Sequence, residues 1–181
     1  ALPISYKKYE TDLIGFAILN KNKNNKVVKI NNSNFFINNN LNVIKYLCSV
    51  NFCIKNKNLL KFDENLGLGI KKLSRSGEDT DFLLRNHKNK EYFYYSKIKV
   101  WHLNHNKNIL IKRFYYGIGS TCCLLKNRIY FLNFMLILKV ILNIAKNLFR
   151  VNFIEIIKLV FFLVGKIFGF FYYYLYLIHY Y

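Results

Sequence analysis

The amino-acid sequence predicts an α/β domain followed by strongly apolar helices. Two observations indicate the α/β class: segments with strand propensity alternate with turn-forming residues early in the chain, and an acidic helical segment precedes a further strand. A third observation, an apolar helical pattern after residue 128, predicts the appended helices. With 53% hydrophobic and 18% aromatic residues, the 181-residue chain is too apolar to be disordered.

The first predicted elements are short strands separated by Asn-rich turns. Turn-forming residues bound each run of β-branched and aromatic residues. These runs predict strands at Leu13–Leu19, Lys26–Ile30, Asn34–Ile37 and Ser49–Lys55. A short helical turn is expected near Leu59 and Leu60, and three glycines indicate an ordered loop over Phe62–Gly77.

A helix and a strand complete the predicted domain. Glu78–Asn89 fits a helix because Asp79 and Asp81 in its first turn interact favourably with the helix dipole. The apolar residues at 82–84 supply burial. Tyr92–Trp101 returns to strand propensity and ends at His102.

The chain becomes helical from Asn106 onward and very apolar after Arg128. On a helical wheel the polar residues of the first apolar stretch form one narrow stripe. They are Arg128, Lys139, Asn143, Lys146 and Arg150. In the next stretch one face holds Glu155, Lys158 and Lys166.

These apolar stretches favour helices that lie in the membrane interface. Neither offers 18 consecutive uncharged residues, so a simple spanning helix is not required. Two alternatives remain: a helical hairpin packed on the protein's own core, and spanning helices whose lysines snorkel. Gly165 and Gly169 form a G-x-x-x-G pattern, a spacing that often arises by chance.

The net charge of +19 does not by itself indicate a nucleic-acid partner. The basic residues are scattered among Asn and Ile, a composition typical of A/T-rich coding DNA, so no nucleic-acid binding is expected. The four cysteines match no zinc-binding spacing and are expected to be reduced, buried thiols. Acidic residues are scarcer, and five of the nine fall between Asp63 and Asp81.

Four motifs follow one another along the chain. They are FDENLGLG at 62–69, SGEDTDFLLR at 76–85, VWHLNH at 100–105 and RFYYGIGS at 113–120. A carboxylate at a helix N-terminus beside glycine-rich backbone is suited to take a proton from a hydroxyl group. Taken singly, each motif has a plainer interpretation: acidic first turns commonly cap helices, and Asp81 with Arg85 fits a surface pair.

Together and in this order, the motifs resemble the second half of a family 2 glycosyltransferase of the GT-A fold. CSVNFCIK at 48–55 fits the same pattern, and KRFYYGIGSTCCLLKN at 112–127 is similar to the helical segment after the catalytic domain of polysaccharide-type members. The resemblance covers about positions 46–126. It implies a partial GT-A catalytic domain with a mixed sheet over 1–105, a helical connector over 106–127 and membrane-associated helices over 128–181.

The resemblance also implies a set of site residues. Asp79 would be the general base that deprotonates the acceptor hydroxyl, and Glu78 would shape the acceptor site. His102, with His105 as a weaker candidate, would coordinate a Mg²⁺ or Mn²⁺ ion. The implied substrate-binding residues are Asp63, Glu64, Gly67, Gly69, Gly77, Asp81 and Arg85.

The implied function is inverting transfer of a sugar from a nucleotide-sugar donor to a polysaccharide or lipid-linked acceptor. Such chemistry belongs to cell-envelope polysaccharide biosynthesis at the cytoplasmic leaflet of the membrane. The D-x-D metal motif of the family's first half does not occur before Asp79, so we expect a fragment that begins after that motif and has no detectable transfer activity alone. The alternative is a non-enzymatic basic module that binds a membrane surface.

Overall fold

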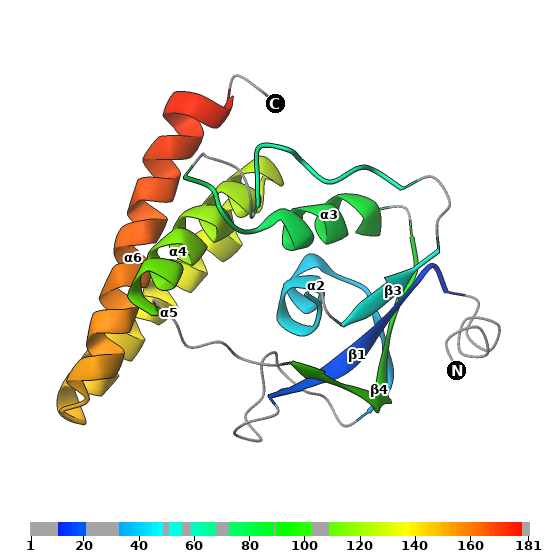
Figure 1. Ribbon diagram of the computed structural model, residues 1–181, viewed down its shortest axis with the longest axis horizontal. Coiled ribbons are helices and arrows are strands. Elements are labelled where there is room, and N and C mark those ends of the chain that lie inside the picture. The colour runs from blue at the N-terminus through cyan, green and yellow to red at the C-terminus, as the bar shows by residue number, and fades with distance from the viewer. Residues whose placement is uncertain are drawn as a thin grey trace. The chain divides into compact units, whose positions relative to one another are not determined.

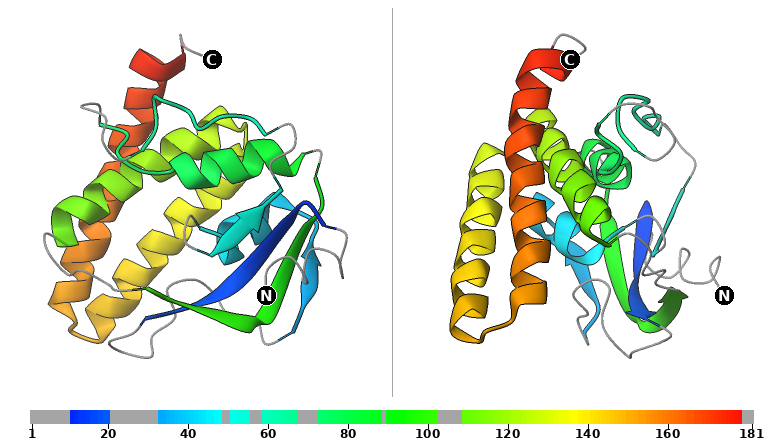
Figure 2. Two further views of the ribbon diagram at one scale, coloured as in Figure 1. Left: turned by 45° about the vertical axis from the view of Figure 1, so that its right-hand side comes forward. Right: turned by 60° about the vertical axis from the view of Figure 1, so that its left-hand side comes forward.

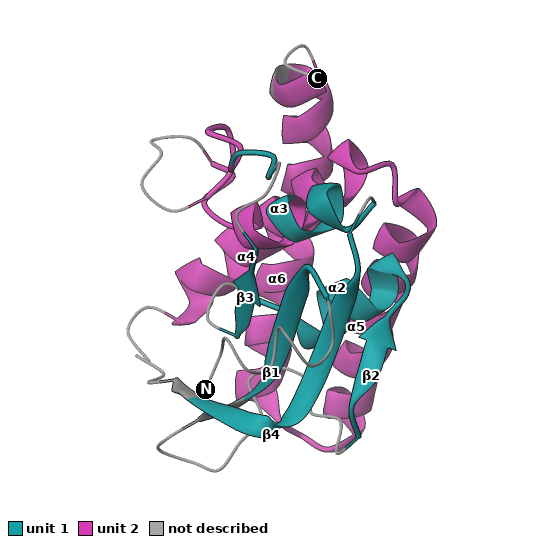
Figure 3. Ribbon diagram, turned by 90° about the vertical axis from the view of Figure 1, so that its right-hand side faces the viewer, with its two compact units in different colours: residues 1–61, 82–105 teal, residues 62–81, 106–181 magenta. Residues whose placement is uncertain are grey.

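The computed structural model describes residues 11–20, 33–48, 51–55, 59–67, 73–88, 90–102 and 109–178 (Figure 1). These residues form a mixed α/β structure with a four-stranded mixed sheet and five helices, which confirms the α/β class. The chain divides into two compact units, 1–61 with 82–105 (unit 1) and 62–81 with 106–181 (unit 2), coloured separately in Figure 3. The segment 62–81, which includes the first turn of α3, groups with the C-terminal helices, and the predicted catalytic domain over 1–105 stays a prediction.

Unit 1 contains the sheet. Its strands are β1 (Leu13–Asn20), β2 (Phe35–Ile37), β3 (Phe52–Ile54) and β4 (Tyr92–His102), in the spatial order β2-β4-β1-β3. The central pair β1 and β4 is parallel, and both edge strands are antiparallel to their neighbours. Four predicted strands are therefore confirmed, and the one expected at Lys26–Ile30 lies outside the described residues.

The core of unit 1 forms around the parallel pair. Leu13 and Ile14 of β1 are buried with Tyr92 and Tyr94 of β4. Asn51 is also fully buried, and its amide group donates hydrogen bonds to the carbonyls of Phe16 (2.6 Å) and Tyr46 (2.7 Å). Because a buried amide must have partners, these bonds hold the segment before β3 against β1.

A helix in unit 1 departs from the sequence prediction of strands and loops only. α2 spans Asn40–Tyr46, and the side chain of Asn39 caps it by accepting a hydrogen bond from the Asn42 backbone N–H (2.8 Å). The cap satisfies a backbone donor that would otherwise lack a partner, so the Asn-rich stretch starts a helix. Leu59 and Leu60, near which a helical turn is expected, are not helical; residues 56–58 lie outside the described part of the chain, and the Leu60 N–H donates to Asn86 Oδ1 (3.0 Å).

The acidic helix is confirmed as α3 (Glu78–His87). Its first four residues belong to unit 2 and the rest to unit 1, so the boundary between the units falls within this helix. In unit 1 the apolar residues at 82–84 are buried as predicted. The hydroxyl of Tyr92 donates to the carbonyl of Leu83 (3.0 Å), which ties the helix to β4.

Unit 2 is a bundle of three helices, α4 (Ile109–Lys126), α5 (Tyr130–Phe149) and α6 (Phe153–Tyr172), extended by a π-helical turn, η1 (Tyr173–Leu177). The three helices lie side by side (Figure 2), and α6 packs against both α4 and α5. The helical pattern predicted after Asn106 is therefore confirmed. Arg128, expected on the polar stripe of the first apolar helix, precedes that helix and adopts a φ of 58°.

Glycines bring α4 and α6 into close contact. A Cβ atom on Gly165 would collide with the backbone carbonyl of Phe114, and one on Gly117 would collide with that of Phe162. A Cβ on Gly169 would lie 2.7 Å from the carbonyl oxygen of Ile118. The G-x-x-x-G pattern is therefore part of a helix–helix contact that only residues without side chains permit.

Candidate functional site

The motif segment between Phe62 and Asp81 packs on α4 inside unit 2. Leu66 joins an apolar cluster with Ile118, Cys122 and Leu125 of α4. Gly77 adopts a φ of 92°, and a Cβ atom there would lie 2.7 Å from the carbonyl oxygen of Gly119. The turn before α3 therefore requires glycine both for its backbone conformation and for its close approach to α4.

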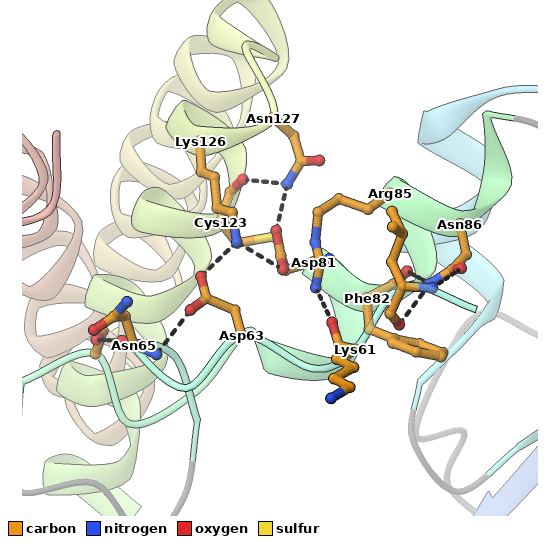
Figure 4. Close-up of polar contacts among 12 residues, drawn as sticks. Lys61, Asp63, Asn65, Asp81, Phe82, Arg85, Asn86, Cys123, Lys126 and Asn127 are labelled. Atoms are coloured by element: carbon orange, nitrogen blue, oxygen red, sulfur yellow. Dashed lines mark hydrogen bonds and ion pairs between the residues drawn. The ribbon is translucent and has the colours of Figure 1, made fainter. Parts of the chain in front are cut away.

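Four polar side chains hold this segment to the end of α4, and we call them the Asp81 cluster: Asp63, Asp81, Lys126 and Asn127 (Figure 4). Asp81 is fully buried. Its Oδ2 atom accepts a hydrogen bond from Lys126 Nζ (3.0 Å), and its Oδ1 atom accepts one from Asn127 Nδ2 (2.9 Å). Lys126 Nζ also forms an ion pair with Asp63.

The cluster gives Asp81 and Asp63 anchoring roles. A buried carboxylate is tolerated only when it is paired and hydrogen-bonded, and both oxygens of Asp81 have such partners. Asp63 also accepts a hydrogen bond from the Asn65 backbone N–H (2.8 Å), which shapes the turn that follows. A substrate that bound Asp81, as the resemblance implies, would have to replace Lys126 or Asn127.

The turn that contains Gly67 lies against Glu78, the first residue of α3. Gly67 has a φ of 111°, and a Cβ atom there would lie 2.9 Å from side-chain carbons of Glu78. The Gly67 N–H donates to the carbonyl of Ser74 (2.8 Å), which closes the loop. Glu64 is exposed, and Gly69 lies outside the described residues.

Asp79, the predicted base, lies in the first turn of α3 and is partly exposed. Its Oδ1 atom accepts a hydrogen bond from the Thr80 backbone N–H (2.8 Å). The helix dipole stabilises a carboxylate at this position. Of the three acidic residues in this turn, only Asp81 is buried, whereas Glu78 and Asp79 retain access to solvent.

The remaining predicted site residues belong to unit 1. Arg85 donates from Nη2 to the backbone carbonyl of Lys61 (2.7 Å). His102 is the last residue of β4, and its side chain is outside what the structure describes, as is all of His105. The structure therefore brings together the predicted residues at 62–81 but does not locate the imidazoles.

The described residues do not define a metal site. Among them, no three His, Cys, Asp or Glu side chains come together as a possible ligand set. The Mg²⁺ or Mn²⁺ ion stays a prediction from the resemblance, and we derive no chemical step through it.

Two buried thiols lie next to the Asp81 cluster. Cys122 and Cys123 are free and buried, as predicted, whereas Cys48 and Cys53 are partly exposed. Burial raises the pKa of Cys122 to about 12. Burial also raises the pKa of Cys123 well above its ordinary value, and the negative charges of Asp81 and Asp79 add to that increase. Burial therefore disfavours the thiolate form, which is the nucleophile, at both positions.

Sequence reasoning missed Lys126 and Asn127 as partners of the motif segment. Both lie within the quoted stretch 112–127, but nothing in that stretch indicates contact with an aspartate about 45 residues earlier. The sequence indicates these partners only indirectly, because a buried acidic residue in a helix requires a positively charged partner from elsewhere in the fold.

An open cavity of about 490 Å³ lies elsewhere, in unit 1. It is lined by the start of α2, the end of α3 and Tyr92. None of the predicted site residues lines it.

Comparisons with protein-family models, with curated proteins and with solved structures returned no match. The functional argument therefore depends on the residues and geometry described above.

Proposed function

We propose that this chain is the acceptor-side part of a GT-A glycosyltransferase of family 2, attached to the cytoplasmic face of a membrane. The observation that carries the proposal is the packing of the two acidic motifs into one structure. Gly67 contacts Glu78, and Asp63 and Asp81 share Lys126, so the FDE and GED segments lie together with Asp79 in the first, partly exposed turn of α3.

In this proposal Asp79 takes the proton of the acceptor hydroxyl. The acceptor oxygen then forms a bond to the anomeric carbon of the donor sugar while the bond from that carbon to the diphosphate breaks. The nucleoside diphosphate leaves with the bonding electrons, and the anomeric configuration inverts. Asp81 has a different role: its buried contacts fix the first turn of α3 and therefore the position of Asp79.

Membrane attachment is supported by α5. This helix is long and apolar enough to cross a membrane by length and composition, and only 11% of its most apolar window is buried. The cytoplasmic face is proposed because nucleotide sugars are made in the cytoplasm and because basic residues favour that leaflet.

The test is transfer by the protein that the complete reading frame encodes. The DNA upstream of the Ala1 codon is sequenced first, and we expect an in-frame region of alternating strands and helices that ends in D-x-D. That protein should transfer sugar from a nucleotide-sugar donor, and Asp79→Asn should abolish the activity without changing membrane binding. Sugar transfer by the 181 residues alone would contradict the proposal that this chain is only the acceptor-side part of the enzyme.

A second candidate is a non-enzymatic module that binds anionic membrane surfaces. Basic residues on the exposed side of α5, Lys139 and Lys146, favour it. This candidate predicts no transferase activity in the complete protein and no effect of Asp79→Asn on any measured property except stability.

A further inference from the structure

Two faces of α6 differ in a way that indicates which solvent each contacts. Between Phe153 and Ile178 the exposed side chains that the structure describes are aliphatic or aromatic, except that of Glu155 in the first turn of α6, which is 44% exposed. The charged residues of this stretch, Glu155, Lys158 and Lys166, lie on one face within about 80° on a helical wheel. Lys166 on that face is buried against the other helices of unit 2, whereas Lys158 and Glu155 near the start of α6 are partly exposed, so the middle of α6 is polar inside and apolar outside.

Lys166 illustrates the inner face. It is fully buried, and its Nζ atom donates to Ser120 Oγ of α4 (3.2 Å) and Asn133 Oδ1 of α5 (3.3 Å). Thr121 of α4 donates to the same Asn133 oxygen (3.5 Å). A water-soluble bundle normally buries its apolar stripe and exposes its charges, so this arrangement is the reverse of the soluble pattern and typical of a helix in lipid.

Helix α5 also has one charged face and one apolar face. The exposed basic residues Lys139 and Lys146 of α5, and Arg150 directly after its last residue, fall within about 40° on a helical wheel. The opposite arc of α5 is apolar and exposed, for example at Phe134, Leu138 and Ile141. A stripe of positive charge opposite an apolar arc is complementary to anionic headgroups above acyl chains.

A spanning arrangement fits these residues less well. Lys139 is exposed and lies at the middle of the 20-residue helix α5, so a span would place its charge near the centre of the hydrocarbon. In an arrangement parallel to the membrane the same lysine reaches the headgroups.

We propose that α5 and α6 lie in the plane of an anionic lipid surface, with the outer face of α6 and the apolar arc of α5 in the acyl boundary and the Lys139–Lys146–Arg150 stripe at the headgroups. This inference rests on the membrane attachment in the proposed function but not on sugar transfer. It identifies the partner as a bilayer and the contact surface as these two faces.

The first experiment measures partition of the whole chain onto vesicles of phosphatidylcholine with phosphatidylglycerol. Ile167→Glu places a charge on the outer face of α6 and should weaken partition at least about tenfold. The matched control is Ile111→Glu on α4, where an isoleucine of similar exposure (55% against 48%) lies off the proposed surface, and its partition should stay within about twofold of wild type. Lys146→Gln should weaken partition about fivefold on these vesicles and leave it unchanged on phosphatidylcholine alone.

The second experiment measures depth, which distinguishes lying from spanning. Spin labels are attached in separate variants, Ile157→Cys, Val164→Cys and Leu175→Cys, in a background with Cys48→Ser and Cys53→Ser. Positions 157 and 175, the first and last of the three labelled positions, are about 27 Å apart along the helix axis. The proposal predicts similar depths for all three, about 5–10 Å below the headgroups.

Other outcomes would overturn the proposal. Depths that differ by more than about 20 Å would establish a spanning helix instead. Labels that remain accessible to water in vesicles, or a lipid-free dimer that Ile167→Glu separates into monomers, would show that something other than lipid covers this face. None of these readouts requires transfer activity, so failure here is distinguishable from failure of the proposed enzyme.

Discussion

The two sides of the α4–α6 pair differ in where they place apolar and charged residues. On the α4 side, the motif segment 62–81 contributes Leu66 to an apolar cluster and buries Asp81 only against a matched cation and amide. On the outer side, α6 exposes aliphatic and aromatic residues beyond its first turn and buries Lys166 inside the bundle. This contrast is what the proposed lipid contact would require: one bundle with water beside the acidic turn of α3 and lipid beyond α6.

The largest expected effect concerns the thiols at the α4 side. Since burial raises the pKa of Cys122 to about 12 from 9.0, its thiolate fraction at pH 8 should be about a thousandfold below that of an unperturbed thiol. Iodoacetamide should therefore modify Cys122 and Cys123 only after denaturation, and any native reaction should speed up about tenfold per pH unit below pH 12. Mass spectrometry of native and urea-treated protein measures this. Equal labelling in both states would mean that iodoacetamide reaches these cysteines in the folded protein.

The next largest effect should come from the glycine contact. Gly165→Leu forces a side chain into the backbone of α4 at Phe114, so we expect the free energy of unfolding to fall by at least about 3 kcal/mol. Denaturation of the lipid-bound protein, followed by circular dichroism, gives the value. Ala145→Leu adds the same kind of side chain at an exposed position of α5 and should change it by less than about 0.5 kcal/mol. If both variants behave alike, α4 and α6 do not pack as described.

Asp81→Asn should have an intermediate effect. Removing the buried charge leaves Lys126 with Asp63 alone, and we expect a loss of about 3 kcal/mol in the free energy of unfolding. Asp79→Asn, in the same helical turn but partly exposed, should cost less than about 1 kcal/mol. Urea denaturation of the two variants makes the comparison. A larger loss for Asp79→Asn would reverse the roles assigned to the two aspartates.

The smallest effect is expected at the one ion pair found within α6. Lys158 Nζ and Glu155 Oε1 are 2.6 Å apart and the two side chains are partly exposed, so Glu155→Gln should change the free energy of unfolding by less than about 1 kcal/mol. The same denaturation assay applies, repeated at high salt. A loss as large as that of Asp81→Asn would mean that this ion pair is buried away from water rather than partly exposed at the edge of the bundle.

Most elements could be predicted from the sequence because their signals are local. Strand propensity located β1 and β4, and the acidic first turn located the start of α3. α2 was missed because its one clear signal, the cap at Asn39, lies among many other asparagines. Whether the glycine spacing on α6 mattered could not be decided from the sequence, since its meaning depends on which helix packs there.

The candidate site was only partly predictable. The motif order located Glu78 and Asp79 at the start of α3, but Asp81 could not be separated from its neighbours by residue type. Asp81 differs from Glu78 and Asp79 because it is buried and contacts Lys126 and Asn127, and these contacts are long-range in the sequence. The sequence grouped Lys166 with Glu155 and Lys158 on one face, but the expectation that lysines of this face point to headgroups is wrong for Lys166, whose burial between helices depends on tertiary packing.

The most direct test of the central claim compares Asp79→Asn with Asp81→Asn in the protein encoded by the complete reading frame. Initial rates of sugar transfer are measured at a temperature where both variants are folded. The account predicts that Asp79→Asn lowers the rate at least about a hundredfold with little change in stability. An Asp79→Asn variant that transfers sugar at the wild-type rate would contradict the account, because the base would then have to be another group.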